Sequence, residues 1–240
     1  MRLIQLIISH GLLKRIIFGC FLFLGFSAFS FAQTEKETNL GTSLSLVLQK
    51  DFSRFLTWEI EQELRLINNN TGFERSVTAT GLDYTLFAKR VKIGAYYAFM
   101  YLYNNSLLYE PRHRYYFNLS YKQPLNDFTL SWRGRFQSTF RDEDRGRYKV
   151  NPKQVLKNKF EIEYTIFGSP WKPYFSFDFS TFLNDPVMGH TLTKIRYQGG
   201  VNWRMNRTDY MEFFLRYDDY QMASDNNALF VGAIYRIKLK

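Results

Sequence analysis

The sequence predicts an all-β fold, an antiparallel transmembrane β-barrel of the outer membrane with short periplasmic turns and longer extracellular loops. Three observations predict it. Apolar and polar residues alternate with a period of two along most of the chain, as they do in strands. Aromatic residues make up 19% of the sequence. Beyond residue 32, no apolar run approaches the length of a membrane helix, so strands are left as the spanning elements.

The N-terminus has the pattern of a cleavable export signal. A basic start precedes an apolar run at 16–32, which ends in the small residues Ser30 and Ala32. We therefore expect a signal peptide at 1–32 and a single barrel domain at 33–240, with an uncleaved anchor as the alternative. Removing the signal takes away three cations and lowers the formal charge from +10 to +7. Cys20, the only cysteine, lies within this signal, so the mature chain would have no disulfide.

The segments before residue 104 alternate apolar side chains with small or charged ones. LGTSLSLVLQ at 40–49 has a leucine at every second position from Leu44, and FLTWEIEQELRL at 55–66 alternates apolar residues with glutamates. SVTATGLDYTL at 76–86 and VKIGAYYAFMYLY at 91–103 are rich in β-branched and aromatic residues. Such residues favour strands.

The later segments continue the alternation. In RHRYYFNLSYK at 112–122, one face is aromatic and the other is basic and polar. The same rhythm recurs in the remaining segments, which are 128–140, 156–166, 173–182, 192–204, 210–218 and 228–239. The connections alternate between short ones and longer ones such as 141–155 and 184–191. Since bacterial single-chain barrels usually have an even strand number, we expect about 10 or 12 strands. Either 40–49 is then incomplete or a further strand lies near 34–40.

If the apolar face is outward, the charged face lines the lumen. This parity assigns sixteen residues to the lumen, which are Glu59, Glu61, Glu63, Arg112, Arg114, Arg133, Arg135, Lys157, Lys159, Glu161, Glu163, Asp178, Lys194, Arg196, Glu212 and Arg216. An Arg or Lys facing lipid near the midplane would cost ~2–4 kcal/mol. A soluble two-sheet protein, with these charges in water, is the alternative. A barrel of the expected size is wider than those whose interior is just filled by side chains and narrower than those with a wide channel. Both a packed interior of ion pairs and a charged pore are therefore possible.

Aromatic side chains are expected to form a girdle at each membrane interface. Those assigned to the long-loop side are Tyr101, Tyr103, Tyr115, Phe140, Phe182 and Tyr217. Those assigned to the short-turn side are Phe55, Trp58, Phe128, Trp171 and Trp203.

The chain also resembles a known family. The succession WEIEQELRL, RHRYYFNLSYK, RGRFQ and LKNKFEIEY is similar to the uncharacterised outer-membrane barrels called domain of unknown function 2490. The resemblance covers the whole mature chain, and RHRYYFNLSYK is its most specific part. It implies an outer-membrane barrel in a Gram-negative bacterium and no particular activity. The final residue, Lys240, departs from the terminal aromatic that such barrels commonly carry.

The favoured hypothesis is a small porin or channel for small, anionic solutes, with the field supplied by Arg112, Arg114, Arg133, Arg135, Lys194 and Arg196. One alternative is a non-conducting structural or adhesion barrel. Another is an outer-membrane lipid hydrolase in which His113 activates Ser138. We expect outer-membrane lipid and lipopolysaccharide as partners, no nucleic acid, no cofactor and no metal. The solute, the conductance and the oligomeric state are left open by the sequence.

Overall fold

The computed structural model describes residues 38–67, 72–87, 90–103, 109–142, 150–221 and 226–239. The predicted signal peptide at 1–32 lies outside these residues. Within the described ranges, all regular secondary structure is β-strand. This part of the chain contains no helix that is long and apolar enough to cross a membrane.

Eleven strands account for most of the described residues. They are β1 (Thr38–Asp51), β2 (Leu56–Ile67), β3 (Gly72–Leu86), β4 (Val91–Tyr103), β5 (Tyr109–Leu125), β6 (Phe128–Arg141), β7 (Lys153–Tyr164), β8 (Trp171–Asp185), β9 (Gly189–Arg204), β10 (Asp209–Tyr220) and β11 (Asn227–Leu239). Each predicted segment overlaps one of these strands. The observed strands extend beyond most of the predicted segments, because hydrogen bonding to the neighbouring strand continues past the residues that alternate between apolar and polar.

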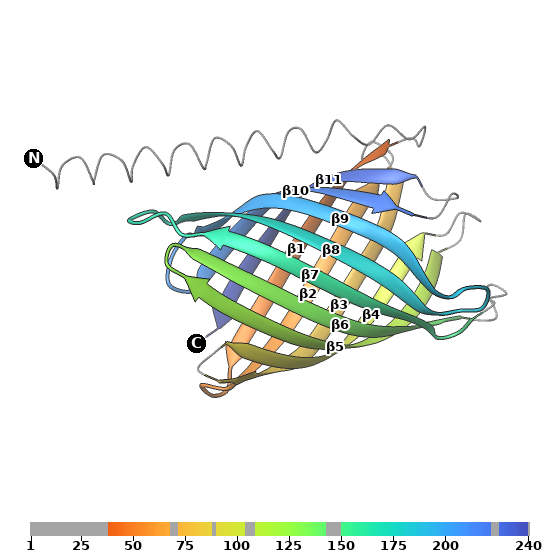
Figure 1. Cartoon of the computed structure of the whole chain (residues 1–240), viewed down its shortest axis with the longest axis horizontal. Coiled ribbons are helices and arrows are strands. Elements are labelled where there is room, and N and C mark those ends of the chain that lie inside the picture. The colour runs from red at the N-terminus through yellow and green to blue at the C-terminus, as the bar shows by residue number, and fades with distance from the viewer. Residues whose placement is uncertain are drawn as a thin grey trace, which may run out of the picture. The chain divides into compact units, whose positions relative to one another are not determined.

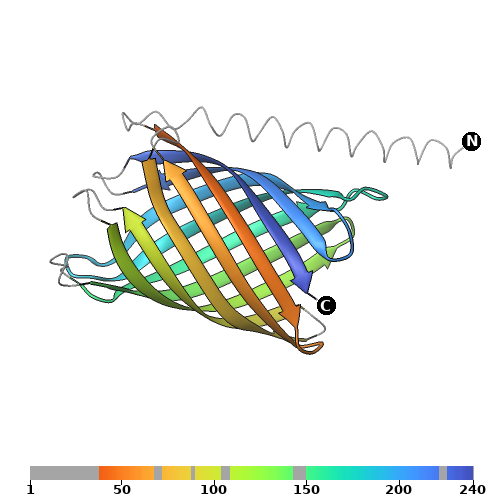
Figure 2. The same ribbon diagram turned by 180° about the vertical axis from the view of Figure 1, so that it is seen from behind.

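The strands close into a barrel in which neighbours in sequence are neighbours in space (Figure 1). Consecutive strands pair antiparallel, and the ring is closed by a parallel pair between β1 and β11 (Figure 2). The expectation of an even strand number was therefore wrong for the described chain, which has eleven strands. An odd number of antiparallel steps leaves the first and last strands pointing the same way, so only a parallel ladder can close the ring.

The parallel seam is long and in register. Its ladder runs from Thr38 opposite Asn227 to Lys50 opposite Leu239, nearly the full length of both strands. Parallel pairing is only slightly less stable per residue than antiparallel pairing. A long seam therefore makes closure with eleven strands physically acceptable.

The two ends of the barrel differ in their connections. At the turn-side end, β1, β3, β5, β7 and β9 end, and the connections described in full there are 52–55, 126–127, 165–170 and 205–208. At the loop-side end, β2, β4, β6, β8 and β10 end, and the connection described in full there is 186–188. The longer loop expected at 184–191 is mostly strand, because Asp185 Oδ1 accepts hydrogen bonds from the Val187 and Met188 amides, at 2.9 and 3.3 Å, and closes a tight turn there.

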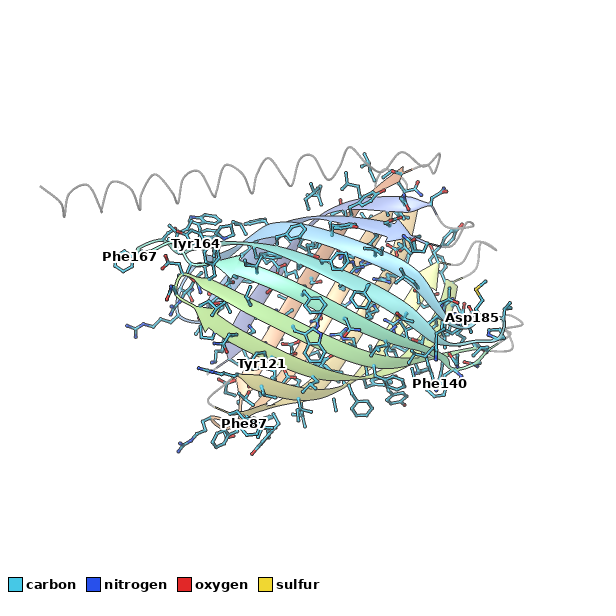
Figure 3. All side chains as sticks on the ribbon, in the orientation of Figure 1. Phe87, Tyr121, Phe140, Tyr164, Phe167 and Asp185 are labelled. Atoms are coloured by element: carbon cyan, nitrogen blue, oxygen red, sulfur yellow. The ribbon has the colours of Figure 1, made fainter. Side chains whose placement is uncertain are left out.

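Exposed apolar side chains occur on every one of the described strands. Figure 3 shows side chains such as Tyr121 and Phe140 projecting from the outer surface of the barrel. Examples are Leu44 on β1, Phe117 on β5 and Val231 on β11, each at least half exposed. Aromatic rings also meet at both ends. Trp171 and Trp203 stack at the turn-side end, with ring centroids 4.9 Å apart.

At the loop-side end, Tyr115 lies edge-on to Phe140 at 6.0 Å. The assignment of Phe182 to an outer girdle was wrong, because this ring is 8% exposed and lies under the Lys153 ammonium. Phe182 shares the parity of the inward residues Asp178 and Ser180 on β8. Its chemistry suggested a girdle, whereas its position along the strand decides its side.

Gly232 permits close packing beside the parallel seam. A Cβ atom at this position would lie 2.2 Å from Phe214 Cζ and 2.6 Å from the Ser43 carbonyl oxygen. We expect Gly232→Val to destabilise the barrel by about 1–3 kcal/mol through overpacking. The measurement is the denaturant midpoint of the folded barrel in detergent. Gly199→Val is the matched control, because no heavy atom lies within 4 Å of a Cβ built there. Equal midpoints for the two variants would contradict the prediction.

Candidate functional site

A cavity of about 1010 Å³ occupies the interior of the barrel. On β5 it is lined from Arg112 to Lys122, and on β7 from Lys153 to Glu163. Ten residues of a strand rise ~33 Å, which at a tilt of ~40° amounts to ~25 Å along the barrel axis. The cavity therefore extends over most of the barrel, from one end towards the other.

The lining of this cavity is strongly cationic. Of the described residues that line it, eighteen are arginine or lysine and eight are aspartate or glutamate. All sixteen charged residues that the alternation assigned to the lumen are among them. Several further cations were absent from that set, including Arg75, Arg141 and Lys153. These three lie at strand ends beyond the predicted segments, so their parity could be read only once the strand bounds were known.

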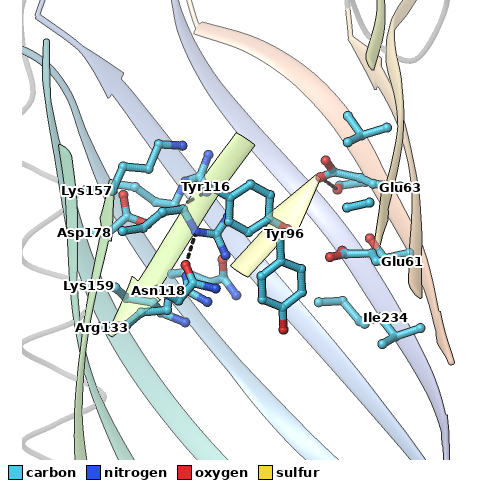
Figure 4. A pocket seen from close by; sticks show the side chains of 18 of the residues that line it. Glu61, Glu63, Tyr96, Tyr116, Asn118, Arg133, Lys157, Lys159, Asp178 and Ile234 are labelled. Atoms are coloured by element: carbon cyan, nitrogen blue, oxygen red, sulfur yellow. Dashed lines mark hydrogen bonds and ion pairs between the residues drawn. The ribbon is translucent and has the colours of Figure 1, made fainter. Parts of the chain in front are cut away.

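The charges are segregated across the lumen. We call Glu59, Glu61 and Glu63 on β2 the acidic wall, and Arg133, Arg135, Lys157 and Lys159 on β6 and β7 the basic wall. In the ring of strands, β2 and β7 are separated by four strands one way and five the other. The two walls therefore face each other. Figure 4 shows Glu61 and Glu63 on one side of the cavity and Arg133, Lys157 and Lys159 on the other.

A stack of side chains lies between the two walls (Figure 4). The Tyr96 and Tyr116 rings are nearly parallel with centroids 4.9 Å apart, and the Arg135 guanidinium lies 4.1 Å from the Tyr116 centroid. Arg135 Nε also donates to Asn118 Oδ1 at 2.7 Å. The stack requires Gly81 on the neighbouring strand, because a Cβ there would lie 2.3 Å from the Tyr96 ring. These rigid side chains narrow the lumen and orient one cation of the basic wall.

Asp218 on β10 is the most enclosed carboxylate of the described wall. Its side chain is fully buried and accepts hydrogen bonds from Arg196 Nε and Nη2 at 2.6 and 2.9 Å and from Lys194 Nζ at 3.2 Å. Arg216 Nε lies 3.7 Å away. One anion thus holds three cations from β9 and β10 in place. Removing it would leave these cations without their shared partner in a partly desolvated wall.

The turn-side half of the lumen has a more balanced set of charges. Lys159 Nζ donates to Glu161 at 2.6 Å, and Lys172 Nζ donates to Glu163 at 3.3 Å. Glu163 also accepts a hydrogen bond from the Asn202 amide at 2.9 Å. Most lining carboxylates lie in this half, which contains Glu59, Glu61, Asp83, Glu161, Glu163 and Glu212. The excess of positive charge therefore lies towards the loop-side end.

The proposed hydrolase pair is not assembled. His113 is exposed on the outer face, and its Nδ1 shares a hydrogen bond of 2.7 Å with the Tyr97 hydroxyl. Ser138 also has outward parity, but its partner across the ladder is Tyr115, whereas His113 is opposite Phe140. In the described residues no hydrogen bond joins the histidine to the serine. These residues also contain no group of three or more His, Cys, Asp or Glu arranged to hold a metal ion.

One of the comparisons with known proteins identifies a family for this chain. A family model described as "Protein of unknown function (DUF2490)" matches residues 41–229. No curated protein matches the chain. Among solved structures, one titled "KdgM porin" is similar at 8% identity and a TM-score of 0.44, over 76% of this chain and 91% of that one.

Proposed function

Since the chain belongs to the DUF2490 family, whose activity is unassigned, we propose from its geometry that it is a small porin of the bacterial outer membrane that passes small anionic solutes. The observation that carries this proposal is the lining of the lumen, with eighteen basic and eight acidic side chains among the described residues. A positive lumen with low-dielectric walls raises the local concentration of anions and repels cations.

The placement in a membrane is supported by the outer surface. Large apolar side chains are exposed on every one of the described strands, whereas soluble monomers rarely expose wide apolar patches. A closed barrel also leaves no unpaired strand edge in contact with lipid. In a soluble protein, the apolar outer surface of the barrel would have to be covered by another layer of protein. The described part of the chain provides no element that could form such a layer.

The direct test is single-channel recording of the refolded, detergent-purified protein in a planar bilayer with a salt gradient. We expect discrete current steps and a reversal potential on the anion-selective side. Folded protein that inserts without producing steps would contradict the channel. It would instead favour a packed polar interior, in which the acidic and basic walls neutralise each other across a closed lumen.

The orientation can be tested with single cysteines, because the mature chain has none of its own. Val187 in a loop-side turn is 78% exposed, and Phe167 in a turn-side connection is 100% exposed. We expect a membrane-impermeant maleimide to label Val187→Cys in intact cells, and Phe167→Cys only after the outer membrane is permeabilised. The opposite result would reverse the orientation. Recovery of both variants in the soluble periplasmic fraction would contradict the membrane placement.

A further inference from the structure

Six cations gather in the loop-side half of the lumen. We call them the loop-side basic cluster, which comprises Arg65 on β2, Arg75 on β3, Lys157 on β7, Lys194 and Arg196 on β9, and Arg216 on β10. All six line the cavity. Because they come from five strands on different sides of the ring, their side chains converge from around the lumen.

The members of the cluster lie close enough to repel one another. Lys194, Arg196 and Arg216 all lie within 4 Å of Asp218, and Arg65 and Arg75 both lie within 4 Å of Glu63. Arg65 and Arg216 share the Phe230 ring, and Lys157 and Lys194 are both paired with Ser180 on the strand between them. The six cations therefore form one electrostatic group. Assembling it in a partly desolvated lumen costs free energy unless negative charge is supplied.

The protein wall supplies only part of that negative charge. In the described chain, carboxylates within ion-pair distance of the cluster are Glu63, beside Arg65 and Arg75, Glu74, beside Arg75, Asp178, beside Arg196, and Asp218, beside Lys194, Arg196 and Arg216. Four anions thus face six cations. Within the same ranges, Lys157 has no carboxylate within 4 Å. The cluster carries an excess of positive charge that is directed at the lumen.

Several hydrogen-bond donors in and beside the cluster have no acceptor in the described structure. Arg65 Nη1, Arg75 Nε, Arg216 Nε and Arg216 Nη2 are buried without a hydrogen-bond acceptor, and the Ser180 hydroxyl is buried without a partner. Arg65 and Arg216 are each only 4% exposed, and their guanidinium groups lie over the Phe230 ring, at 5.4 and 4.6 Å from its centroid. Ser180 pairs with Lys157 on one side and Lys194 on the other. Buried donors of this kind are costly unless an acceptor reaches them.

We propose that the loop-side basic cluster is a binding site for a phosphoryl group, so that the channel takes up phosphate or phosphate esters in preference to chloride. The proposal rests on the proposed anion channel and names its solute class. A phosphoryl group carries close to two negative charges near neutral pH, with several acceptor oxygens in a tetrahedral array. Arginine forks match phosphate oxygens, and lysines supply point charge beside them. A chloride ion or a single carboxylate provides only one charge, whereas the buried donors and the hydroxyl without a partner lie on four strands, β2, β3, β8 and β10.

The test uses the full mature barrel in a planar bilayer carrying chloride current. Inorganic phosphate at pH 8 is expected to reduce the chloride current in a saturable manner, with half-reduction at low millimolar concentration or below. Glycerol 3-phosphate in a second arm distinguishes an esterified phosphoryl group from free phosphate. If it reduces the current at lower concentration than phosphate, the solute is an ester. A chloride current indifferent to both anions would overturn the proposal while leaving the anion channel intact.

Two lysine variants test whether phosphate binds at the loop-side basic cluster or elsewhere in the lumen. Lys157→Gln removes a charge that has no ion-pair partner among the described residues, so the barrel should fold at least as well as the wild type. We expect it to raise the half-reduction concentration of phosphate at least tenfold. Lys122→Gln is the control, because Lys122 also lines the lumen without a described ion pair but lies in the turn-side half. It should change that concentration by no more than twofold. Equal effects of the two variants would overturn the site.

A second readout does not require conduction. Thermal unfolding of the folded barrel in detergent is measured with phosphate and with chloride at equal ionic strength, because a ligand that binds only the folded state raises its midpoint. Stabilisation by phosphate that is lost in Lys157→Gln would support the site even if no current steps were seen, in which case the channel alone would fail. No stabilisation together with no steps would contradict both.

Discussion

Replacing Arg133 and Arg135 together with glutamate is expected to weaken the anion preference of the lumen strongly, because the described lining changes from eighteen basic and eight acidic side chains to sixteen and ten. Both side chains line the cavity on the basic wall, and the double change moves the lumen by four charge units. The new carboxylates would face the acidic wall across the lumen and place like charges on both sides of the passage. Since focusing by charged walls changes local ion concentrations by an order of magnitude or more, we expect the anion-to-cation permeability ratio to fall at least ~10-fold. The measurement is the reversal potential under a salt gradient.

The selectivity of the double variant reports on charge only if the barrel remains folded and open. Arg135 also stacks on Tyr116 and donates to Asn118, so its replacement removes a contact as well as a charge. A neutral pair, Arg133→Gln with Arg135→Gln, separates the two effects and should give an intermediate ratio. Arg207→Glu in the exposed turn at 205–208 is the control outside the lumen and should leave the ratio unchanged. A charge-reversed variant that still conducts with the original selectivity would show that β6 does not supply the field.

Asp218→Asn is expected to cause a large loss of stability, about 3–5 kcal/mol. The carboxylate is fully buried and holds Lys194, Arg196 and Arg216. An asparagine keeps the size and the polar atoms but removes the charge, so three cations would remain together without their shared anion. The free energy of unfolding, measured by denaturant titration of the barrel in lipid or detergent, should fall accordingly.

A neighbouring residue provides the matched control for this loss. Asp219 is the next residue on β10, has the opposite parity and hydrogen-bonds through its carboxylate to the Gln221 side chain. Asp219→Asn should change the unfolding free energy by less than ~1 kcal/mol, as is typical of exposed polar contacts. Added phosphate should recover part of the stability of Asp218→Asn, because it returns negative charge to the same cations. Similar stabilities of the two variants would contradict the role assigned to Asp218.

Alternation alone placed the polar face of each strand because the side-chain period of a strand is two. This is why Glu59, Arg133 and Lys194 could be assigned to the lumen before any pairing was known. The same rule, applied to Phe182, would have placed it inside. Judging that residue by its aromatic chemistry led to the wrong side.

Partnerships across the wall could not be predicted in this way. His113 and Ser138 share a face, yet the ladder sets Ser138 opposite Tyr115, so no catalytic pair forms. Asp218 and its three cations come together through the register of β9 with β10, which positions Arg196 beside it. A shift of register by two residues would keep every side chain on its face and separate these partners.

The all-β class, the approximate position of each strand and the face on which its charges lie could be predicted from the residues, because local alternation encodes all three. Closure of eleven strands through a parallel seam became visible only in the folded barrel. So did the meeting of six cations from five strands in one half of the lumen. The physical reason is that closure and lateral register are properties of the whole ring. They depend on hydrogen bonds between strands that are far apart in the sequence, such as those that carry Thr38 and Asn227, and no local pattern records them.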